Sequence, residues 1–273
     1  MNLPGIGEIP GAWDLRTGFD AYIGGVNVTG ERVLEIGPAT GFVTMELERR
    51  GANVVAAEVT DERGWDFVPQ ARLDMAAIRQ ERSAHIRDIK NTFWFVHKAT
   101  ESQSRVYYGD VENLPDGLGR FDTAFLLSVL LHCRNPQAIL ESAARLTDKR
   151  VVVTDIHFPE LGDLPVMKLI PTGDSSIWDT WWSFTPAFFQ QFLGVMGFDR
   201  FDLSFHSQPN LGVENQLFTL VAERSTTADS EDTPAVASSD DQPQDSAASG
   251  GASAARRLAN RLRQGLAHTP GSK

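Results

Sequence analysis

Short apolar runs alternate with amphipathic segments along the first 224 residues of the chain. Continuous runs of Val, Ile, Leu and Phe are typical of parallel strands buried on both faces. Seven such runs are predicted to be strands: Arg32–Ile36, Asn53–Val59, Arg105–Tyr108, Phe121–Leu127, Arg150–Asp155, Phe198–Phe205 and Gln216–Ala222. Four helices are predicted between them: Phe42–Arg50, a long stretch near Gln70–Lys98, Pro136–Leu146 and Pro186–Met196.

This repeated strand–helix–strand order predicts the α/β fold class. The expected architecture is a three-layer αβα sandwich with a Rossmann-like, mainly parallel seven-stranded sheet. The last two strand runs lie close together in the sequence, so we expect them to form an antiparallel edge.

The chain divides into four predicted parts. Residues 1–29 form a lead-in, 30–224 the α/β domain, and 225–254 an acidic Ser/Ala-rich linker that has too few apolar side chains to fold. Residues 255–273 form a basic tail in which leucines four apart share one helical face. This tail could bind a membrane surface or a protein partner; the alternative is a frayed, solvated end.

Composition and charge limit the possible partners. Residues 1–224 hold 20 basic and 30 acidic side chains, so a nucleic-acid partner is unlikely. The longest strongly apolar run has eight residues, too short for a transmembrane segment, which needs about 20. The start lacks the features of a secretory signal, and the single cysteine, Cys133, cannot form an internal disulfide. We therefore expect a cytoplasmic protein, and we predict no metal site.

The loop after the first strand carries the clearest chemical signal. Glycines at 37 and 41 allow a sharp turn and a close approach of the backbone to a ligand. The second strand ends near Glu58, 21 residues after Gly37. An acid at about this spacing accepts hydrogen bonds from the ribose hydroxyls of an adenosine. The pattern predicts an adenosine-containing ligand.

The charge of this loop favours one adenosine ligand over another. The dinucleotide fingerprint G-x-G-x-x-G fails at two positions, Ala39 and Phe42. Glu35 would lie near the pyrophosphate of a dinucleotide, where its charge is unfavourable. The ammonium and sulfonium groups of S-adenosylmethionine reverse that sign. S-adenosylmethionine is therefore favoured over NAD.

These residues resemble the class I S-adenosylmethionine-dependent methyltransferase family. Glu35-x-Gly37-x-x-x-Gly41 is similar to the family's first motif, Tyr108-Gly-Asp-Val111 to its third strand end, and the run from Phe121 to His132 to its fourth strand. The resemblance covers roughly residues 30–223. Ala39 departs from it, because many members have glycine there.

The resemblance implies a role for each matching residue. Glu35 and Ser128 would lie along the methionine moiety, and Glu58 would bind the ribose. The turn beneath the cofactor would be shaped by Gly37, Pro38 and Gly41, and the adenine would be held by Asp110 and Val111. In this family a lead-in often folds over the cofactor, so Trp13, Arg16 and Tyr22 could form a lid.

Two histidines are candidate general bases. His132 follows the fourth strand and His157 follows the fifth, and both strand ends should face the cofactor. A histidine with its usual pKa of about 6.5 can accept a proton near neutral pH. The alternative for both is a packing or helix-capping role.

Two long connections are expected to determine the acceptor. One lies between Glu58 and Ser104, and the other between the fifth strand and the Pro186 helix. The second contains Trp178, Asp179, Trp181 and Trp182, which are predicted to form an aromatic wall over the site. The alternative is hydrophobic closure of a long loop.

The leading functional hypothesis is a methyltransferase that acts on an oxygen or nitrogen of a small-molecule or sugar-bearing acceptor. The alternatives are an RNA (tRNA) methyltransferase, a catalytically inert methyltransferase-like binding module, and an NAD oxidoreductase.

Overall fold

The computed structural model describes residues 1–9 and 11–225. The predicted linker and basic tail lie outside the described residues, apart from Ser225. The described helices are α1 (Phe19–Tyr22), α2 (Phe42–Arg49), α3 (Met75–Ala99), α4 (Pro136–Arg145) and α5 (Pro186–Val195), with short 3₁₀ turns η1 (Asp116–Leu118), η2 (Leu130–His132) and η3 (Pro159–Leu161).

The described strands form one large sheet and two small hairpins. The large sheet contains β3 (Arg32–Ile36), β4 (Asn53–Glu58), β5 (Arg105–Tyr108), β6 (Phe121–Leu127), β7 (Thr147–Ile156), β10 (Arg200–Asn210) and β11 (Val213–Glu223). The hairpins pair β1 (Asn2–Leu3) with β2 (Gly7–Glu8), and β8 (Met167–Leu169) with β9 (Trp182–Phe184). Because these small elements are only two to four residues long, they and α1 have no detectable period in the sequence.

The order of the large sheet is β10-β11-β7-β6-β3-β4-β5. All pairs from β7 to β5 are parallel, whereas β11 runs antiparallel to both of its neighbours. The prediction of a mainly parallel seven-stranded sheet with an antiparallel edge is confirmed.

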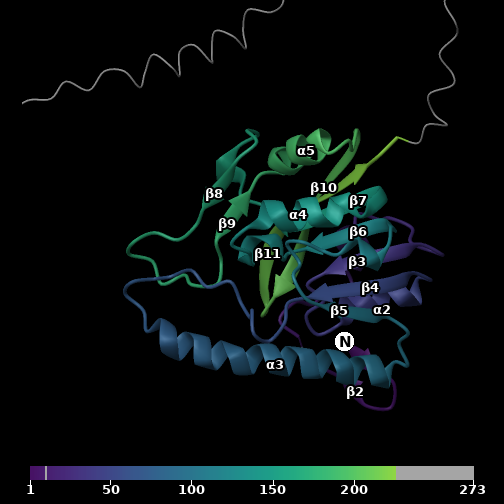
Figure 1. Ribbon diagram of the computed structural model, residues 1–273, viewed down its shortest axis with the longest axis horizontal. Helices are drawn as coiled ribbons and strands as arrows, with labels where there is room; N and C mark the ends of the chain where they lie inside the picture. Colours follow the sequence, from purple (N-terminus) through teal and green to yellow (C-terminus); the bar gives the residue numbers. More distant parts are fainter. Residues whose placement is uncertain (10, 226–273) are drawn as a thin grey trace, which may run out of the picture. The chain divides into compact units, whose positions relative to one another are not determined.

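Helices cover both faces of the sheet, as the three-layer prediction requires (Figure 1). One face buries apolar side chains of α4, such as Leu140, against β6 and β7, and side chains of α5, such as Phe189, against β11. The other face packs α1 and α2 through Phe19 and Leu47. The C-terminal half of α3 packs near α2 on this second side, where Phe93 is fully buried.

The strand order places a switch point between β3 and β6. From β3 the chain continues through β4 to β5 in one direction, and from β6 it continues to β7 in the other. The connections therefore diverge at the carboxyl ends of β3 and β6, where a crevice forms in open α/β sheets. Ligands of such sheets bind there, so the site is described from this edge outward.

Candidate functional site

The turn after β3 is held in the left-handed backbone region at three positions. Gly37 has φ of 73°, Ala39 of 47° and Gly41 of 90°. A Cβ atom at position 37 would lie 2.8 Å from Cγ2 of Val129, so only glycine fits there. Gly41 is the N-cap of α2, and its N–H donates to the carbonyl of Pro38 at 2.9 Å. The turn predicted at Gly37, Pro38 and Gly41 is present.

Ala39 is strained in this turn. A left-handed conformation costs a residue with a Cβ roughly 1–2 kcal/mol, and glycine avoids this cost. Alanine in place of glycine at this position therefore keeps the conformation of the turn but makes its backbone strained.

Two carboxyl groups lie beside the turn, that of Glu35 buried and that of Glu58 partly buried. Glu35 is 3% exposed, and its Oε2 accepts a 2.5 Å hydrogen bond from Oγ1 of Thr44. Burial raises the pKa of Glu35 to about 7, and repulsion from the Glu58 carboxylate adds to this shift. Burial also raises the pKa of Glu58. Such a pair is unfavourable for an anionic ligand and favourable for a cationic one.

Glu58 is the last residue of β4, and a buried lysine holds the loop that follows it. Oε1 of Glu58 accepts from the N–H of Val59 at 2.7 Å. The ammonium of Lys90 donates to the carbonyl of Val59 at 2.7 Å and to Oδ1 of Asp61 at 2.6 Å. Sequence reasoning missed Lys90, although it falls on the apolar face of α3 between Ile86 and Phe93, and a lysine there signals a buried role.

The lead-in residue Tyr22 reaches the carboxyl end of β6. Its hydroxyl donates to Oγ of Ser128 at 3.0 Å. Ser128 itself has φ of 51°, and its N–H donates to the carbonyl of Thr154 at 2.6 Å. The other two lead-in candidates point elsewhere: Trp13 bridges to Asn210, and the exposed Arg16 pairs with Asp14 and Glu8.

The two candidate adenine residues have different surroundings. Val111 is buried in the core. Asp110 is exposed, and its Oδ1 accepts from Nη1 of Arg63 at 3.1 Å and from the N–H of Glu112 at 3.0 Å. Arg63 also pairs with the carboxylate of Glu112. Arg63 thus fastens the loop after β4 onto the turn after β5, a contact that the sequence did not indicate.

His132 has a defined tautomer. Its Nδ1 lies 2.6 Å from the carbonyl oxygen of Asp179, which can only accept, so Nδ1 carries the proton and Nε2 keeps a lone pair. Burial lowers the pKa of His132, so the ring is neutral near pH 7. The indole of Trp65 packs edge-on against it, with ring centroids 5.5 Å apart.

His157 lies at the end of β7 next to a buried acid. Its ring packs against Phe205 at 4.7 Å, and its Nδ1 is buried without a hydrogen-bond partner among the described residues. Two positions earlier, Asp155 is 2% exposed and its Oδ2 is likewise unpartnered. Burial raises the pKa of Asp155 to about 7. From the sequence, Asp155 was predicted only as the last residue of a strand. An acid at the end of an apolar strand could have indicated a buried carboxyl group at the site.

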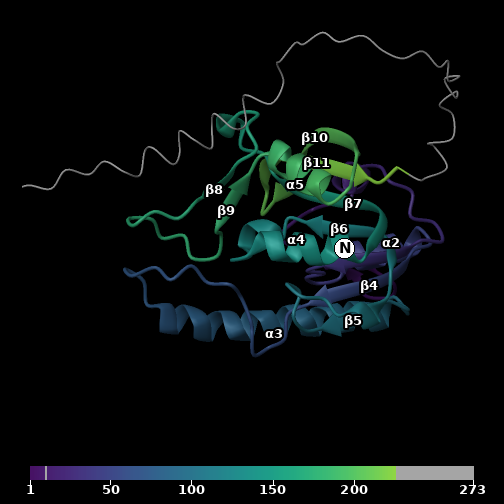
Figure 2. The same cartoon turned by 45° about the horizontal axis from the view of Figure 1, so that its top comes forward.

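The two long connections are joined by hydrogen bonds. The N–H of Val68 donates to the carbonyl of Trp178 at 2.8 Å, and the indole of Trp181 donates to the carbonyl of Asp66 at 2.6 Å. The N–H of Trp181 also donates to the carbonyl of Leu131, one residue before His132. Both views show these loops next to the N-terminal half of α3, which extends beyond the sheet (Figures 1 and 2).

Trp182 belongs to β9 and packs differently from the other two tryptophans. Its ring lies 6.5 Å from that of Trp181, and its Nε1 is buried without a partner in the described part of the chain. It also packs on the core beneath α4 and α5. Trp178 and Trp181 are therefore both hydrogen-bonded to the first long connection, whereas Trp182 packs on the core.

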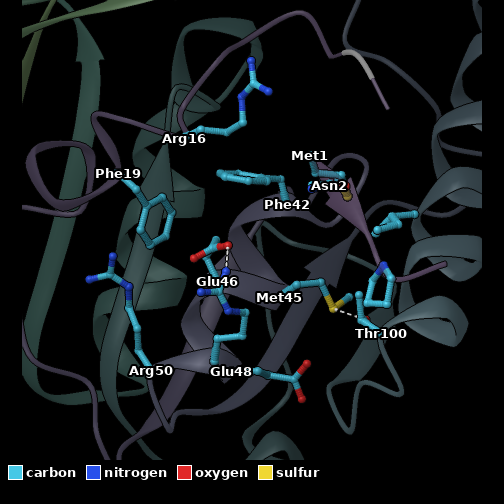
Figure 3. A pocket seen from close by; sticks show the side chains of 13 residues that line it. Met1, Asn2, Arg16, Phe19, Phe42, Met45, Glu46, Glu48, Arg50 and Thr100 are labelled. Atoms are coloured by element: carbon cyan, nitrogen blue, oxygen red, sulfur yellow. Dashed lines mark hydrogen bonds and ion pairs between the residues drawn. The ribbon is translucent and has the colours of Figure 1, made fainter. Parts of the chain in front are cut away.

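A cavity of about 670 Å³ lies away from these residues (Figure 3). Its lining includes β1 and the outward face of α2, with Phe42 and Met45 supplying apolar surface. Its arginines already have carboxylate partners; Arg50, for instance, pairs with Asp20. None of the predicted cofactor or acceptor residues lines this cavity.

Comparison with known proteins identifies the fold. A protein of Bacillus halodurans C-125, provisionally named a methyltransferase (BH2331), matches with a TM-score of 0.52 at 13% identity, over 77% of this chain and 100% of that chain. The chain has the fold of the class I methyltransferases. No protein-family model and no curated protein sequence matches it.

Two further solved structures match with lower TM-scores and higher sequence identity. The N-terminal domain of EvdMO1 with SAH bound has a TM-score of 0.45 and 19% identity, over 77% of this chain and 79% of that one. Magnesium protoporphyrin IX methyltransferase (ChlM) from Synechocystis PCC 6803 with bound SAH has a TM-score of 0.43 and 19% identity, over 73% of this chain and 76% of that one.

The described residues contain neither a candidate membrane-spanning helix nor a candidate metal-binding cluster. No helix among them has the length and apolar character needed to cross a membrane. Within the same residues no group of three or more His, Cys, Asp or Glu side chains is placed to hold a metal ion.

Proposed function

We propose that the protein is an S-adenosylmethionine-dependent methyltransferase that acts on an oxygen or nitrogen of a small-molecule acceptor. The observation that carries this proposal is the buried carboxyl group of Glu35 together with the partly buried one of Glu58, beside a left-handed glycine turn at the switch point of a methyltransferase fold.

The residues at this edge fit a cationic adenosine ligand. The carboxyl of Glu35 would hold the ammonium group of the methionine moiety, and that of Glu58 would accept from the ribose hydroxyls. Asp110 and Val111 would contact the adenine, and Ser128 the methionine side. A dinucleotide would place its pyrophosphate close to Glu35. Because this site is buried, the repulsion between the pyrophosphate and the Glu35 carboxylate would be strong.

The chain's own contribution to the reaction is alignment and proton transfer. When bound, the cofactor supplies an electrophilic methyl group on a positively charged sulfur, which leaves as a neutral thioether. The protein holds the acceptor atom in line with that group. His132 accepts the proton of an acceptor hydroxyl or amine at Nε2, because its Nδ1–H is held by the carbonyl of Asp179. His157 stands as the second candidate base.

A direct experiment tests this function. The protein is incubated with methyl-labelled S-adenosylmethionine and an extract of the native cells that contains both small molecules and RNA, and labelled products are identified by mass. Parallel calorimetry measures binding of S-adenosylmethionine, S-adenosylhomocysteine and NAD. Tight binding of the first two together with a labelled small molecule is expected. Binding of NAD alone would refute the proposal; cofactor binding without any labelled product would favour the inert binding module, and labelled RNA would favour the RNA methyltransferase.

A further inference from the structure

Three arginines gather on the aromatic wall formed by the two long connections. The guanidinium of Arg82 lies over the ring of Trp178 at 4.5 Å, and that of Arg79 over the ring of Phe67 at 4.9 Å. The Phe67 and Trp178 rings are 5.9 Å apart, so these two stacks are adjacent. Two arginines one turn apart on α3 thus bring two positive charges to a surface that both connections form.

The third arginine arrives from the start of α4. Nη2 of Arg134 donates to the carbonyl of Phe67 at 3.2 Å, and its guanidinium lies 5.1 Å from the centroid of Trp181. Arg134 therefore touches the same wall from the side of His132. Arg79 and Arg82 come from α3 and Arg134 from the segment before α4, and Phe67 contacts both Arg79 and Arg134.

None of these guanidinium groups pairs with a carboxylate of the described residues, and one has an unmet donor. Nε of Arg82 is buried and has no hydrogen-bond partner within the described residues. Elsewhere on the same protein arginines do pair with acids, as Arg63, Arg120, Arg145 and Arg150 show. A buried guanidinium N–H that has no acceptor costs free energy. A ligand that supplies a hydrogen-bond acceptor to this N–H is therefore favoured.

Two acids lie within the wall, and each already accepts a hydrogen bond. Oδ2 of Asp66 accepts from the backbone N–H of Arg134 at 2.9 Å. Oδ1 of Asp179 accepts from Oγ1 of Thr180 at 3.2 Å. Three arginines against two acids leave this surface with net positive charge, in a body whose acids outnumber its bases by 30 to 20.

We propose that Arg82 and Arg134, supported by Arg79, bind an anionic group, a carboxylate or a phosphate, on the small-molecule acceptor. This inference rests on the proposed function for the identity of the ligand as the acceptor. The wall contacts His132 through Trp65 and through the Leu131–Trp181 hydrogen bond, so an acceptor held there by its anionic end presents its other atoms to the candidate base. Guanidinium groups suit this task because their planar donors match carboxylate and phosphate oxygens.

A small anionic molecule fits this surface better than a nucleic acid. A polyanion meets the acidic surface of the rest of the body, and only three arginines are available to oppose it. One anionic group needs no more than two of them. The surface therefore favours a small molecule with a single anionic group over a polyanion.

The first experiment probes the anion site without the methyl donor. Trp178 and Trp181 are two of the six tryptophans that contribute to the intrinsic fluorescence, so the full chain is titrated with inorganic phosphate, pyrophosphate and citrate at fixed ionic strength. The wild type should give a saturable response with at least one of these anions. Arg82→Gln and Arg134→Gln should each weaken it at least tenfold, and Arg82→Lys should weaken it less. Arg87→Gln, on the exposed surface of the same helix, is the matched control and should match the wild type.

A second experiment identifies the source of the anionic group. The extract is separated by anion exchange, and each fraction is tested as acceptor with methyl-labelled S-adenosylmethionine. Label should enter molecules of the anionic fraction. Phosphatase treatment of that fraction should abolish labelling if the anchor is a phosphate, and amidation of its carboxylates should do so if it is a carboxylate. Arg82→Gln should raise the acceptor KM at least tenfold and leave cofactor binding unchanged.

The two proposals fail in different ways. Absence of cofactor binding refutes the proposed function, while the anion titration still decides the arginine site. No saturable anion response, an equal response in Arg82→Gln, labelling confined to the uncharged fraction, or ribonuclease-sensitive labelling would each overturn the anion-anchor proposal.

Discussion

The hydroxyl of Tyr22 donates a 3.0 Å hydrogen bond to Oγ of Ser128, across 106 positions of sequence. Tyr22 is 3% exposed, and its own carbonyl accepts from Oγ1 of Thr154 at 2.8 Å. Ser128 is held in the left-handed backbone region at the carboxyl end of β6. The lead-in therefore fixes a residue of the candidate cofactor site from the opposite end of the domain.

Replacing Tyr22 with Phe removes only this hydroxyl. The Ser128 hydroxyl then loses a partner in a buried site, which costs about 1 kcal/mol. We expect a drop in unfolding free energy of that size and a threefold to tenfold weaker binding of S-adenosylhomocysteine. Denaturant unfolding and calorimetry measure the two effects. Tyr107→Phe, on β5, is the comparison variant; equal cofactor affinity for Tyr22→Phe and wild type would argue against a positioning role.

Glu58→Ala tests the ribose contact. Loss of a charged acceptor for two hydroxyls should weaken cofactor binding at least tenfold, about 1.4 kcal/mol. Calorimetry with S-adenosylmethionine gives the affinity. Glu62→Ala removes an exposed acid from the same loop and should leave the affinity unchanged. A Glu58→Ala protein that binds as tightly as the wild type would eliminate the ribose assignment.

The buried acids make the stability of the ligand-free protein depend on pH. Glu35 and Asp155 have folded-state pKa values of about 7, above their ordinary values of 4.5 and 3.8, so the folded state binds more protons between those limits. The contribution of these two groups to stability is therefore greatest below about pH 3.8. It falls as pH rises to about 7, by about 3 kcal/mol for Glu35 and about 4 kcal/mol for Asp155. Unfolding free energies measured from pH 5 to 8 should decrease, and Glu35→Gln should reduce the slope.

Cofactor binding should release a proton from the same carboxyl. A cationic ligand favours the ionised form of Glu35, so its pKa falls on binding. At pH 6, calorimetry in buffers with different ionisation enthalpies should show net proton release. Glu35→Gln should lower this release; proton uptake by the wild type would contradict the assignment of Glu35.

Ala39→Gly should stabilise the protein. The wild-type residue has φ of 47°, where alanine is strained by roughly 1–2 kcal/mol, partly offset by the greater freedom of glycine in the unfolded chain. A net gain of about 0.5–1 kcal/mol is expected in thermal or denaturant unfolding. The same change at Ala77, an exposed position of α3, should instead destabilise by about 0.5–1 kcal/mol. Destabilisation at both positions would show that the turn relaxes in solution.

His132→Gln tests the proposed base. Loss of a positioned proton acceptor lowers kcat by about 10²–10⁴. The affinity for S-adenosylmethionine should not change, because no cofactor contact is assigned to this side chain. His157→Gln serves as the comparison, with a smaller expected loss. If His157→Gln lost the greater part of kcat and His132→Gln did not, the base would be His157.

The sequence alone determined the fold, because each main element carries its own local signal. The strands β3 to β7 each contain a short run of apolar residues, and α2, α4 and α5 begin and end within one residue of the predicted limits. The glycine turn and Glu58 could also be located from spacing, since a switch point at the first strand is a consequence of strand order.

Tertiary structure alone decided how distant segments meet at the site. Arg63 joins Asp110, Tyr22 joins Ser128, and Arg82 reaches Trp178 only because separate loops fold onto one sheet edge. Burial likewise depends on the packing of the whole domain. Burial raises the pKa of Glu35, and it leaves Nε of Arg82 without a hydrogen-bond acceptor among the described residues. Local pattern specifies elements, whereas contacts and electrostatics depend on which elements become neighbours.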